Sequence, residues 1–527
     1  MSGAVLDRPP MTSPKPEAPV ADLVTFEERL PQEWKWSRRL AGCVLALGLV
    51  YAWFGLKPLW HTDVWGHLNY GRWIVSHGTL PATEPTMPLA QGVPFVDPYW
   101  LCQVLGYWTI QGLGVAGIQG VSSLMITTMG ALLLHRCWQR TRSMGFAYLG
   151  LAAFLWLDWS TLAIVRPQLA GLLCFCVLLH RMTSPRATTI DWVLVPATHL
   201  VWANMHGSFV LGLALQGAFV AGRALDLLRR TGALRSVWHD HFVRRWLLWL
   251  QLSAVATLVN PYGIGLYLEV WRVSGNPNLA SLTEWQTLDI RATHGLVFVA
   301  SVVALAMLYR FTPRRIASWE VLTLVGLALA SLWSARFLSW WAPVAAVLGT
   351  VHLHASLRRW CPWQAMPAPS PRSGKWTVVT LGLMWIFLGY SPLGMRLIHG
   401  KDAVLEKSVS EYTPLGAVEY LRESPPEGLV FNVFEFGDYL QWAGPPGIRV
   451  FVNSHAHLVP REVWLHYLQV IEQTAGWEEV FDRYGVNTVM VDTKYREPLI
   501  RRMKDNAAWK IGYQDSRAVV FVRKASI

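Results

Sequence analysis

The sequence predicts a polytopic α-helical membrane protein that ends in a small α/β domain outside the membrane. Hydrophobic residues make up 53% of the 527 residues, charged residues only 15%, and 30 residues are tryptophan. Water-soluble folds rarely have this composition. Apolar runs of membrane-spanning length recur up to residue 393, whereas the segment 394–527 alternates short apolar stretches with charged ones. The fold class follows from these observations together.

Eleven apolar runs are candidates for membrane-spanning helices, because each is close to the roughly 20 residues that cross a bilayer. They are 40–57, 113–135, 145–164, 167–181, 191–205, 207–227, 245–260, 294–310, 318–334, 337–354 and 376–393. The preceding segment 1–37 is polar and rich in proline, and we expect it to be disordered. Arg38 and Arg39 stand directly before the first span, which places the N-terminus in the cytoplasm. No cleavable signal peptide is evident.

The segment 98–111 (PYWLCQVLGYWTIQ) could form a twelfth span, and the arginine clusters decide against it. If this segment lies along the membrane, the clusters fall in alternate loops, as expected for cytoplasmic loops. They are Arg136/Arg140/Arg142, Arg181/Arg186, Arg229/Arg230/Arg235/Arg244/Arg245, Arg310/Arg314/Arg315 and Arg358/Arg359/Arg372/Lys375. We therefore expect an interfacial helix at 98–111, inside an outer loop 58–112. A transmembrane domain 38–393 of the plasma (inner) membrane results.

The tail 394–527 has the pattern of a soluble α/β domain on the extracytoplasmic side. Short apolar strands are predicted at 429–433, 449–452, 488–491 and 518–522, with helices at 463–473, 477–484 and 498–506 between them. Its basic residues do not contradict the topology, because long tails cross largely regardless of charge.

The net charge of +12 and the six cysteines indicate neither nucleic-acid binding nor a disulfide framework. The basic residues lie in short clusters between apolar runs, and no basic and aromatic platform for nucleic acid is visible. The cysteines lie mostly in or beside apolar runs and lack the spacing of zinc ligands. We expect them to be packing residues.

The stretch HTDVWGHLNYGRWIVSHG, residues 61–78, places an acid at the membrane edge. Asp63 by itself could be a solvated carboxylate or the first-turn residue of a helix, where the dipole favours it. The same outer loop also carries further titratable residues. They include His61, His67, Glu84 and Asp97. Such a group above a membrane is a candidate reaction site, and we expect Trp65 and Trp73 to anchor it at the interface.

The topology gathers other polar residues at the same outer face. They are Arg166, Asn204, His206, Asn260 and Arg336 near the ends of spans, and Glu284 in the long loop 261–293. Any one of them could be a helix cap or a snorkelling side chain. Together they predict a binding site for a lipid phosphate, because two lone arginines offer bidentate hydrogen bonds to phosphate.

The first outer loop resembles that of GT-C fold membrane glycosyltransferases, the class that includes protein mannosyltransferases and lipid A aminoarabinose transferases. The pattern "D.W.HL..G..I...G.LP" stands here as Asp63, Trp65, His67, Leu68, Gly71, Ile74, Gly78, Leu80 and Pro81. About eleven spans and a C-terminal extracytoplasmic domain fit the same family. Val64 follows Asp63 where many mannosyltransferase-type enzymes have a second acid, so the resemblance does not extend to that subgroup.

The resemblance implies a transferase that moves a sugar from a polyprenyl-phosphate carrier to an extracytoplasmic lipid, glycan or protein. Asp63 would orient or deprotonate the acceptor, with Glu84 or Asp97 as a second acid. Arg166 or Arg336 would stabilise the departing lipid phosphate. Membrane lipids are implied partners, and nucleic acid is not.

Two other classes of function remain open from the sequence. A flippase or transporter of lipid-linked glycans would also need polar groups, although it would place them near the bilayer midplane. A scaffold could use His455 and His457 in the tail as a binding or metal site. No cofactor is certain, and a divalent cation held by His61, Asp63 and His67 is a further candidate.

Overall fold

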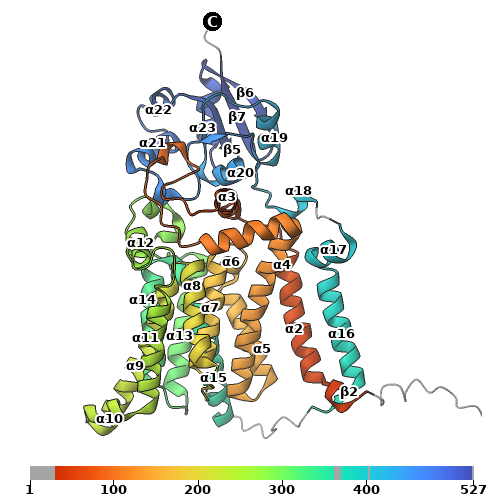
Figure 1. Ribbon diagram of the computed structural model, residues 1–527, viewed down its shortest axis with the longest axis vertical. Helices are drawn as coiled ribbons and strands as arrows, with labels where there is room; N and C mark the ends of the chain where they lie inside the picture. Colours follow the sequence, from red (N-terminus) through yellow and green to blue (C-terminus); the bar gives the residue numbers. More distant parts are fainter. Residues whose placement is uncertain (1–29, 185, 361–369, 402–403, 525–527) are drawn as a thin grey trace, which may run out of the picture.

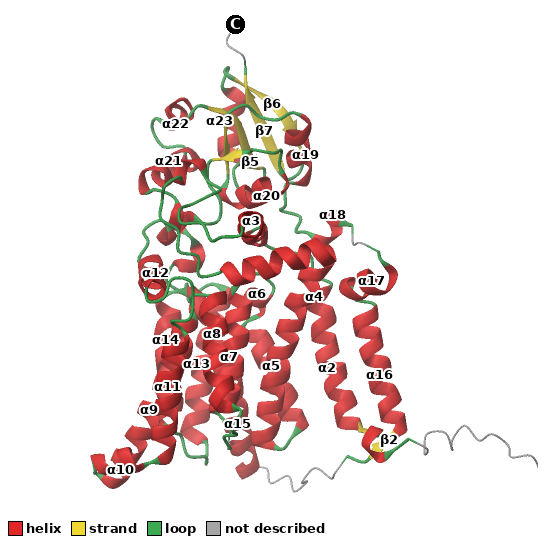
Figure 2. Ribbon diagram, viewed as in Figure 1, coloured by secondary structure: helices red, strands yellow, loops and turns green. Residues whose placement is uncertain are grey.

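The computed structural model describes residues 30–184, 186–360, 370–401 and 404–524. A bundle of helices forms its lower part, and a mixed α/β layer lies on top of it (Figure 1). Figure 2 shows that the larger strands are confined to this upper layer. Most of the segment 1–37 expected to be disordered, and Cys361, lie outside the described residues.

Each of the eleven predicted spans coincides with a helix of the bundle. The helices are α2 (Arg38–Gly55), α4 (Trp100–Thr141), α5 (Met144–Leu157), α7 (Gln168–Met182), α8 (Asp191–Met205), α9 (Phe209–Thr231), α11 (His241–Ala256), α13 (Thr293–Phe311), α14 (Ser318–Trp333), α15 (Leu338–Trp360) and α16 (Gly374–Gly389). Among the described residues, α2, α4, α9 and α13 are each long and apolar enough to cross a membrane, and α5, α7 and α14 are shorter apolar helices. The protein is therefore a membrane protein, while the exact number of crossings stays a prediction.

Short elements connect and flank the bundle helices. They are η1 (Gln32–Trp34), α6 (Trp159–Leu162), α10 (Leu234–His239), α12 (Gly265–Ser274), α17 (Pro392–His399), α18 (Leu405–Ser408), and the turns η2 (Pro88–Ala90), η3 (Leu279–Ser281), η4 (Thr283–Trp285), η5 (Ala335–Phe337) and η6 (Ala456–Leu458). Helix α17 bends by 89° away from α16. The predicted domain boundary at residue 393 falls inside α17.

The segment 98–111 is not a separate span but the first part of α4. Figure 1 shows this part, in orange, lying across the top of the bundle before the helix turns downward. The turn occurs at Gly114, where φ is 63° and ψ is −163°. A positive φ favours glycine because it has no Cβ. The glycine-rich run around residue 114 thus separates an interfacial helix from a span.

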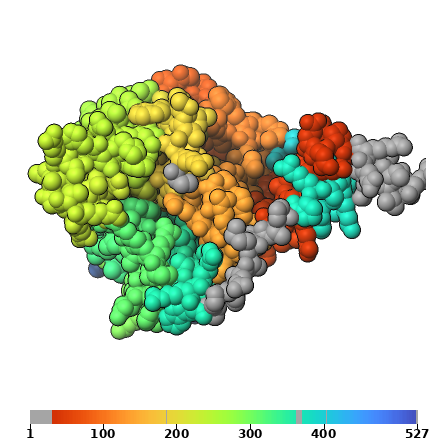
Figure 3. All heavy atoms as spheres, turned by 90° about the horizontal axis from the view of Figure 1, so that it is seen from below, coloured from red at the N-terminus to blue at the C-terminus, as the bar shows by residue number. Residues whose placement is uncertain are grey.

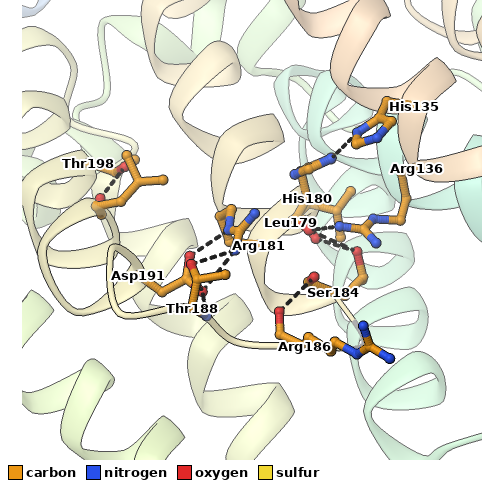
Figure 4. Close-up of polar contacts among 12 residues, drawn as sticks. His135, Arg136, Leu179, His180, Arg181, Ser184, Arg186, Thr188, Asp191 and Thr198 are labelled. Carbon is orange, nitrogen blue, oxygen red and sulfur yellow. Dashed lines mark hydrogen bonds and ion pairs between the residues drawn. The ribbon is translucent and has the colours of Figure 1, made fainter. Parts of the chain in front are cut away.

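Polar contacts connect the helices at the lower end of the bundle. The rings of His135 on α4 and His180 on α7 approach to 3.0 Å, and the Arg136 guanidinium donates to the His180 carbonyl (Figure 4). Arg181 donates to Asp191 at the start of α8, with a distance of 2.6 Å between Nε and Oδ1. At one edge of the lower face (Figure 3), the two-residue strands β1 (Trp36–Ser37) and β2 (Arg372–Ser373) pair and hold α2 beside α16.

The upper layer contains a five-stranded sheet with strand order β4-β3-β5-β7-β6. Its strands are β3 (Leu429–Asn432), β4 (Arg449–Val450), β5 (Val486–Asp492), β6 (Trp509–Gln514) and β7 (Ala518–Arg523), and its helices are α19 (Leu415–Glu423), α20 (Phe434–Ala443), α21 (Arg461–Glu472), α22 (Trp477–Arg483) and α23 (Glu497–Asp505). Strands β4, β3 and β5 run parallel to one another, and β7 pairs antiparallel with both β5 and β6. Four strands and three helices match the prediction, whereas β6, α19 and α20 were not predicted.

The outer-loop helix α3 (Asp63–His77) lies between the interfacial part of α4 and helix α20. Trp65 is only 2% exposed, and its ring packs against Tyr439 and Trp442 at centroid distances of 5.3 and 5.9 Å. The expectation that Trp65 anchors the loop in the membrane interface is therefore wrong. The side chain is buried by the α/β layer instead, because α20 covers the upper face of α3.

Gly66 sets the distance between α3 and α20. A Cβ at this position would lie 2.4 Å from Oδ1 of Asp438. We expect Gly66→Ala to separate the two helices and to cost about 1–3 kcal/mol, as overpacking does. Thermal unfolding of the purified protein would measure the loss. Gly112→Ala is the matched control, because a Cβ there meets nothing within 4 Å. Equal stability of both variants would contradict the proposed close packing.

Candidate functional site

A polar cavity of about 70 Å³ lies where the bundle, helix α3 and the α/β layer meet. Helix α3 contributes Asp63 and His67, and the turn before α7 contributes Arg166. The loop 261–293 and η5 add Glu284 and Arg336, respectively. Residues that lie more than 390 positions apart in the chain thus line one site, since its upper wall comes from the loop that follows β4.

Arg166 is the centre of an ion-pair network in this cavity. Its Nε lies 2.7 Å from Oδ2 of Asp63, and its Nη1 lies 2.5 Å from Oε2 of Glu284. Nη1 of Arg336 is 3.6 Å from Oε1 of the same glutamate. On the other side, Nδ1 of His61 is 2.7 Å from Oδ1 of Asp63. The two lone arginines predicted from the topology therefore share the cavity of Asp63.

Local structure positions both arginines. Arg166 immediately precedes Pro167, the N-cap residue of α7, so its side chain points from the end of the helix rather than along it. Arg336 lies in the short turn between α14 and α15, and its guanidinium is 4.3 Å from the ring centroid of Trp285. A cation–π contact of this kind holds the charge at the edge of the bundle.

The network fixes the charges of the two acids. Burial raises the pKa of Asp63, but the charges of Arg166 and His61 outweigh it and hold the pKa far below the ordinary value. Burial likewise opposes the ionisation of Glu284, and Arg336 and Arg166 together lower its pKa. Both groups are therefore carboxylates at neutral pH, and they balance the two guanidinium groups.

Histidines form the other polar wall of the cavity. Burial lowers the pKa of His67 and of His457 to about 4, and it lowers the pKa of His455 well below the ordinary value. These imidazoles are neutral at pH 7, so each has one N–H donor and one acceptor nitrogen. A ligand rich in hydroxyl groups, which also donate and accept, matches such a wall.

The loop 453–458 brings His455 and His457 to the cavity, together with Ser454. Asn278 holds this loop from below: its Nδ2 donates to the carbonyls of Ala456 and Val459 at 2.9 and 2.7 Å. From the sequence, His455 and His457 are expected only as a separate binding or metal site of the tail. The sequence signal was the polar run NSHAH after a strand, but nothing in it indicates contact with loop 261–293.

Two of the predicted acids do not line the cavity. Glu84 is buried and accepts hydrogen bonds from the Tyr70 hydroxyl at 2.7 Å and from the backbone N–H groups of Thr86 and Met87. Asp97 is also buried, and its Oδ1 accepts from Tyr99 N at 2.9 Å. Both carboxyls stabilise the turns of the outer loop, and a catalytic role for either stays a prediction.

The two predicted asparagines are also used locally. Asn204 accepts from the indole N–H of Trp100 at 3.1 Å and donates to the Val259 carbonyl at 2.9 Å, so it ties the start of α4 to the bundle. Asn260 accepts from Tyr262 N at 2.7 Å in a tight turn. Neither lines the cavity, whereas His206 does.

The candidate cation ligands His61, Asp63 and His67 do not form a coordination group. Within residues 30–184, 186–360, 370–401 and 404–524, no three His, Cys, Asp or Glu side chains are arranged to hold a metal ion. His61 and Asp63 pair with each other, and the second oxygen of Asp63 faces Arg166. The residues present therefore do not fit a metal in this arrangement.

A second cavity, of about 530 Å³, adjoins the polar one. The two share several lining residues, among them Tyr99, His206 and Arg336. From there the second cavity extends along α9, α12 and α15. Large apolar side chains dominate its walls, and they include Leu211, Trp271, Trp333, Phe337 and Trp340. A charged pocket thus opens into an apolar groove at the top of the bundle.

No family model and no curated protein matches the sequence. Solved structures do match. ArnT from Cupriavidus metallidurans bound to undecaprenyl phosphate aligns with a TM-score of 0.52 at 14% identity, over 93% of this chain and 98% of that one. The oligosaccharyltransferase AglB from Archaeoglobus fulgidus, in complex with an inhibitory peptide and a dolichol-phosphate, aligns with a TM-score of 0.54 at 11% identity. The alignment covers 93% of this chain and 74% of AglB. The arabinofuranosyltransferase AftD from Mycobacteria aligns with a TM-score of 0.51 at 14% identity, over 93% of this chain and 40% of AftD.

The chain has the GT-C fold. The three matched proteins are membrane glycosyltransferases of this fold, and the likeness extends over nearly the whole described chain. The resemblance expected from the pattern around Asp63 is thereby confirmed for the fold. Identities of 11–14% carry no assignment of reaction, because one fold hosts many activities.

The neutral histidines make the stability of this site sensitive to acid. In the unfolded chain they bind protons near pH 6.5, whereas the folded site binds one at His457 only near pH 4. Stability from this group is therefore present above pH 6.5 and is lost as the pH falls towards 4. We expect His457→Gln to reduce the fall of the unfolding temperature between pH 7 and 4. The exposed His239→Gln is the control, and identical pH slopes in both variants would refute this assignment.

Proposed function

We propose that the protein is a membrane glycosyltransferase that transfers a sugar from a polyprenyl-phosphate carrier to an extracytoplasmic acceptor. The observation that carries the proposal is the junction of the two cavities, where a pocket with two arginines opens into an apolar groove. A polyprenyl-phosphate sugar has the same order of parts, with a polar sugar, an anionic phosphate and a long apolar chain. We therefore assign the sugar to the cavity wall formed by the histidines and the polyprenyl chain to the apolar groove.

The phosphate is assigned to the junction, between Arg166 and Arg336. Guanidinium groups bind phosphate oxygens through paired, charge-assisted hydrogen bonds. Both arginines contact Glu284 in the free site, so an incoming phosphate competes with this glutamate and with Asp63. The structures of ArnT and AglB, which contain undecaprenyl phosphate and dolichol-phosphate, respectively, support a carrier of this class.

Asp63 is assigned to the acceptor nucleophile. Its low pKa depends on Arg166 and His61, and it rises when a phosphate draws the Arg166 guanidinium away. The carboxylate then becomes a better proton acceptor for the attacking hydroxyl or amine. Attack opposite to the phosphate breaks the bond between the anomeric carbon and the phosphate oxygen, with inversion. This chemistry is the same for a lipid, a glycan or a protein acceptor that offers a hydroxyl or an amine.

The orientation in the plasma membrane follows from the arginine clusters, which we assign to the cytoplasm. Arg136 and Arg181 lie near the C-terminal ends of α4 and α7, where polar contacts join these helices (Figure 4). Helix α3, which carries Asp63, lies above the bundle (Figure 1). We propose eleven spans, a cytoplasmic N-terminus and an extracytoplasmic α/β domain from residue 394. Transfer would then take place on the outer side of the membrane.

Binding of undecaprenyl phosphate tests the proposed phosphate site. We expect Arg336→Gln to weaken binding to the purified protein in nanodiscs by about 10- to 100-fold, because a hydrogen bond to a charged group contributes roughly 1.5–3 kcal/mol. Native mass spectrometry would measure the bound fraction. Arg235→Gln, at the opposite end of the bundle, should bind like the wild type. Unchanged affinity of the Arg336 variant would exclude this phosphate site.

The role of Asp63 is tested by release of polyprenyl phosphate from polyprenyl-phosphate sugars extracted from the source cells. Asp63→Asn should bind undecaprenyl phosphate but lose at least about 100-fold in release, the usual effect of removing a general base. A folded Asp63→Asn protein with full release would remove the residue from this role. Movement of the carrier across liposome membranes without release would instead favour the flippase hypothesis.

A further inference from the structure

We propose that Asp438 of the α/β layer is the proton source for the departing phosphate and that it acts through Ser454. The inference deepens the proposed transferase function and rests on it. It concerns a residue of α20, a helix that the sequence did not predict. If it holds, the α/β layer takes part in the reaction rather than only covering the site.

Asp438 lies at the contact between α20 and α3. Its side chain is completely buried, and its Oδ1 is the atom that prevents any Cβ at Gly66. Gly66 comes three residues after Asp63, which is almost one helical turn, so both lie on the same side of α3. Two carboxyl groups from different parts of the chain therefore lie close together beside the polar cavity.

The two carboxyls have opposite environments. Asp63 is ion-paired with Arg166 and His61, whereas the Asp438 carboxyl is contacted by the uncharged Ser454, through its hydroxyl and its backbone N–H. Burial first, and then the charge of Asp63, raise the pKa of Asp438 well above its ordinary value. A charged group so placed would lose its hydration without compensation. Asp438 is therefore protonated at neutral pH, and the pair holds one proton.

Ser454 connects Asp438 to the cavity. It lies next to the Asp438 carboxyl and itself lines the polar pocket. Its Oγ is also 3.3 Å from Nδ1 of His455, another wall residue. A hydroxyl can donate one proton while it accepts another. The buried acid is thus one side chain away from the polar pocket.

The leaving phosphate gives this proton a use. Cleavage converts a phosphodiester with one negative charge into a phosphomonoester that can carry two. Arg166 and Arg336 face Asp63 and Glu284 in the free site, and the wall histidines His67 and His457 are neutral. A proton delivered to the phosphate oxygen as the bond breaks keeps the leaving group a monoanion, which is the role of a general acid.

The proposed step conserves protons and charge. The acceptor oxygen bonds to the anomeric carbon and its proton passes to Asp63, while the bond from that carbon to the phosphate oxygen breaks with its electron pair. The phosphate oxygen takes the Ser454 proton, and Ser454 takes the proton of Asp438. Asp63 is then protonated and Asp438 charged. Return of one proton from Asp63 to Asp438 restores the starting state.

Four other titratable groups lie around Asp438. The charge of Asp63 raises its pKa and the charge of Arg166 lowers it. His455 follows Ser454 in the facing loop, and Glu435 lies on α20 itself. Asp97 is the alternative buried acid, because burial raises its pKa to about 7. Only its Oδ1 accepts hydrogen bonds from described residues, Tyr99 and Gln103, but neither Asp97 nor the Gln103 side chain that contacts it lines the polar cavity.

The experiment compares the pH dependence of polyprenyl phosphate release in the full-length protein and its variants. Asp438→Asn should lower release about 100-fold or more, and the decline of the wild-type rate at alkaline pH should disappear. Asp97→Asn is the matched buried control and should keep that decline. Ser454→Ala should resemble Asp438→Asn, whereas Ser454→Thr, which keeps the hydroxyl, should retain release.

Infrared difference spectroscopy supplies a second measurement that needs no substrate. At alkaline pH, where Asp97 is ionised, the wild type should still show a protonated carboxyl band, which Asp438→Asn should remove and Asp97→Asn should leave. Persistence of that band in Asp438→Asn, or wild-type release and pH profile in this variant, overturns the inference. Failure of the proposed function has a different result: the wild-type protein would neither bind undecaprenyl phosphate nor release polyprenyl phosphate. In that case the proton-source role is excluded as well.

Discussion

The guanidinium of Arg166, whose side chain is only 13% exposed, is the constraint on which the rest of the site depends. A charge removed from water must be paired, because burial without a partner costs far more than most single interactions return. Arg166 finds its partners in Asp63 of the outer loop and Glu284 of the loop 261–293. The bundle, the first outer loop and the long loop must therefore come together around one side chain, and this places Asp63 and the two arginines beside the apolar groove.

Helix α3 carries this arrangement into the α/β layer. Its lower face rests on α4 and its upper face on α20, so the acid at its first position is held from two sides. Gly66 permits the close contact with α20, and Asn278 fastens the loop 453–458 to the bundle. The candidate site is thus assembled from three segments that are rigid for different reasons. Such preorganisation is what an electrostatic site needs before its substrate arrives.

Part of the site could be predicted because the membrane topology alone decides at which end of the bundle a residue lies. Arg166, His206 and Arg336 follow or precede spans on the same side, and short turns hold such residues at one face of a bundle. Glu84 and Asp97 show the limit of this argument. Their carboxyls lie in the predicted loop, yet nearby backbone N–H and side-chain donors engage them. Whether a polar side chain serves a turn or a cavity depends on local geometry that residue type does not reveal.

The sequence by itself determined the membrane class, the positions of the bundle helices, most strands of the tail and the place of Asp63 at the start of an outer-loop helix. These are local properties, since hydropathy, charge and periodicity are read within one segment. Only the tertiary structure decided that Trp65 is covered by α20, that His455 and His457 face the cavity, and that Asp438 lies beside Asp63. Each of these depends on docking between segments hundreds of residues apart. Complementary shape and paired burial direct such docking, and neither leaves a periodic signal in the chain.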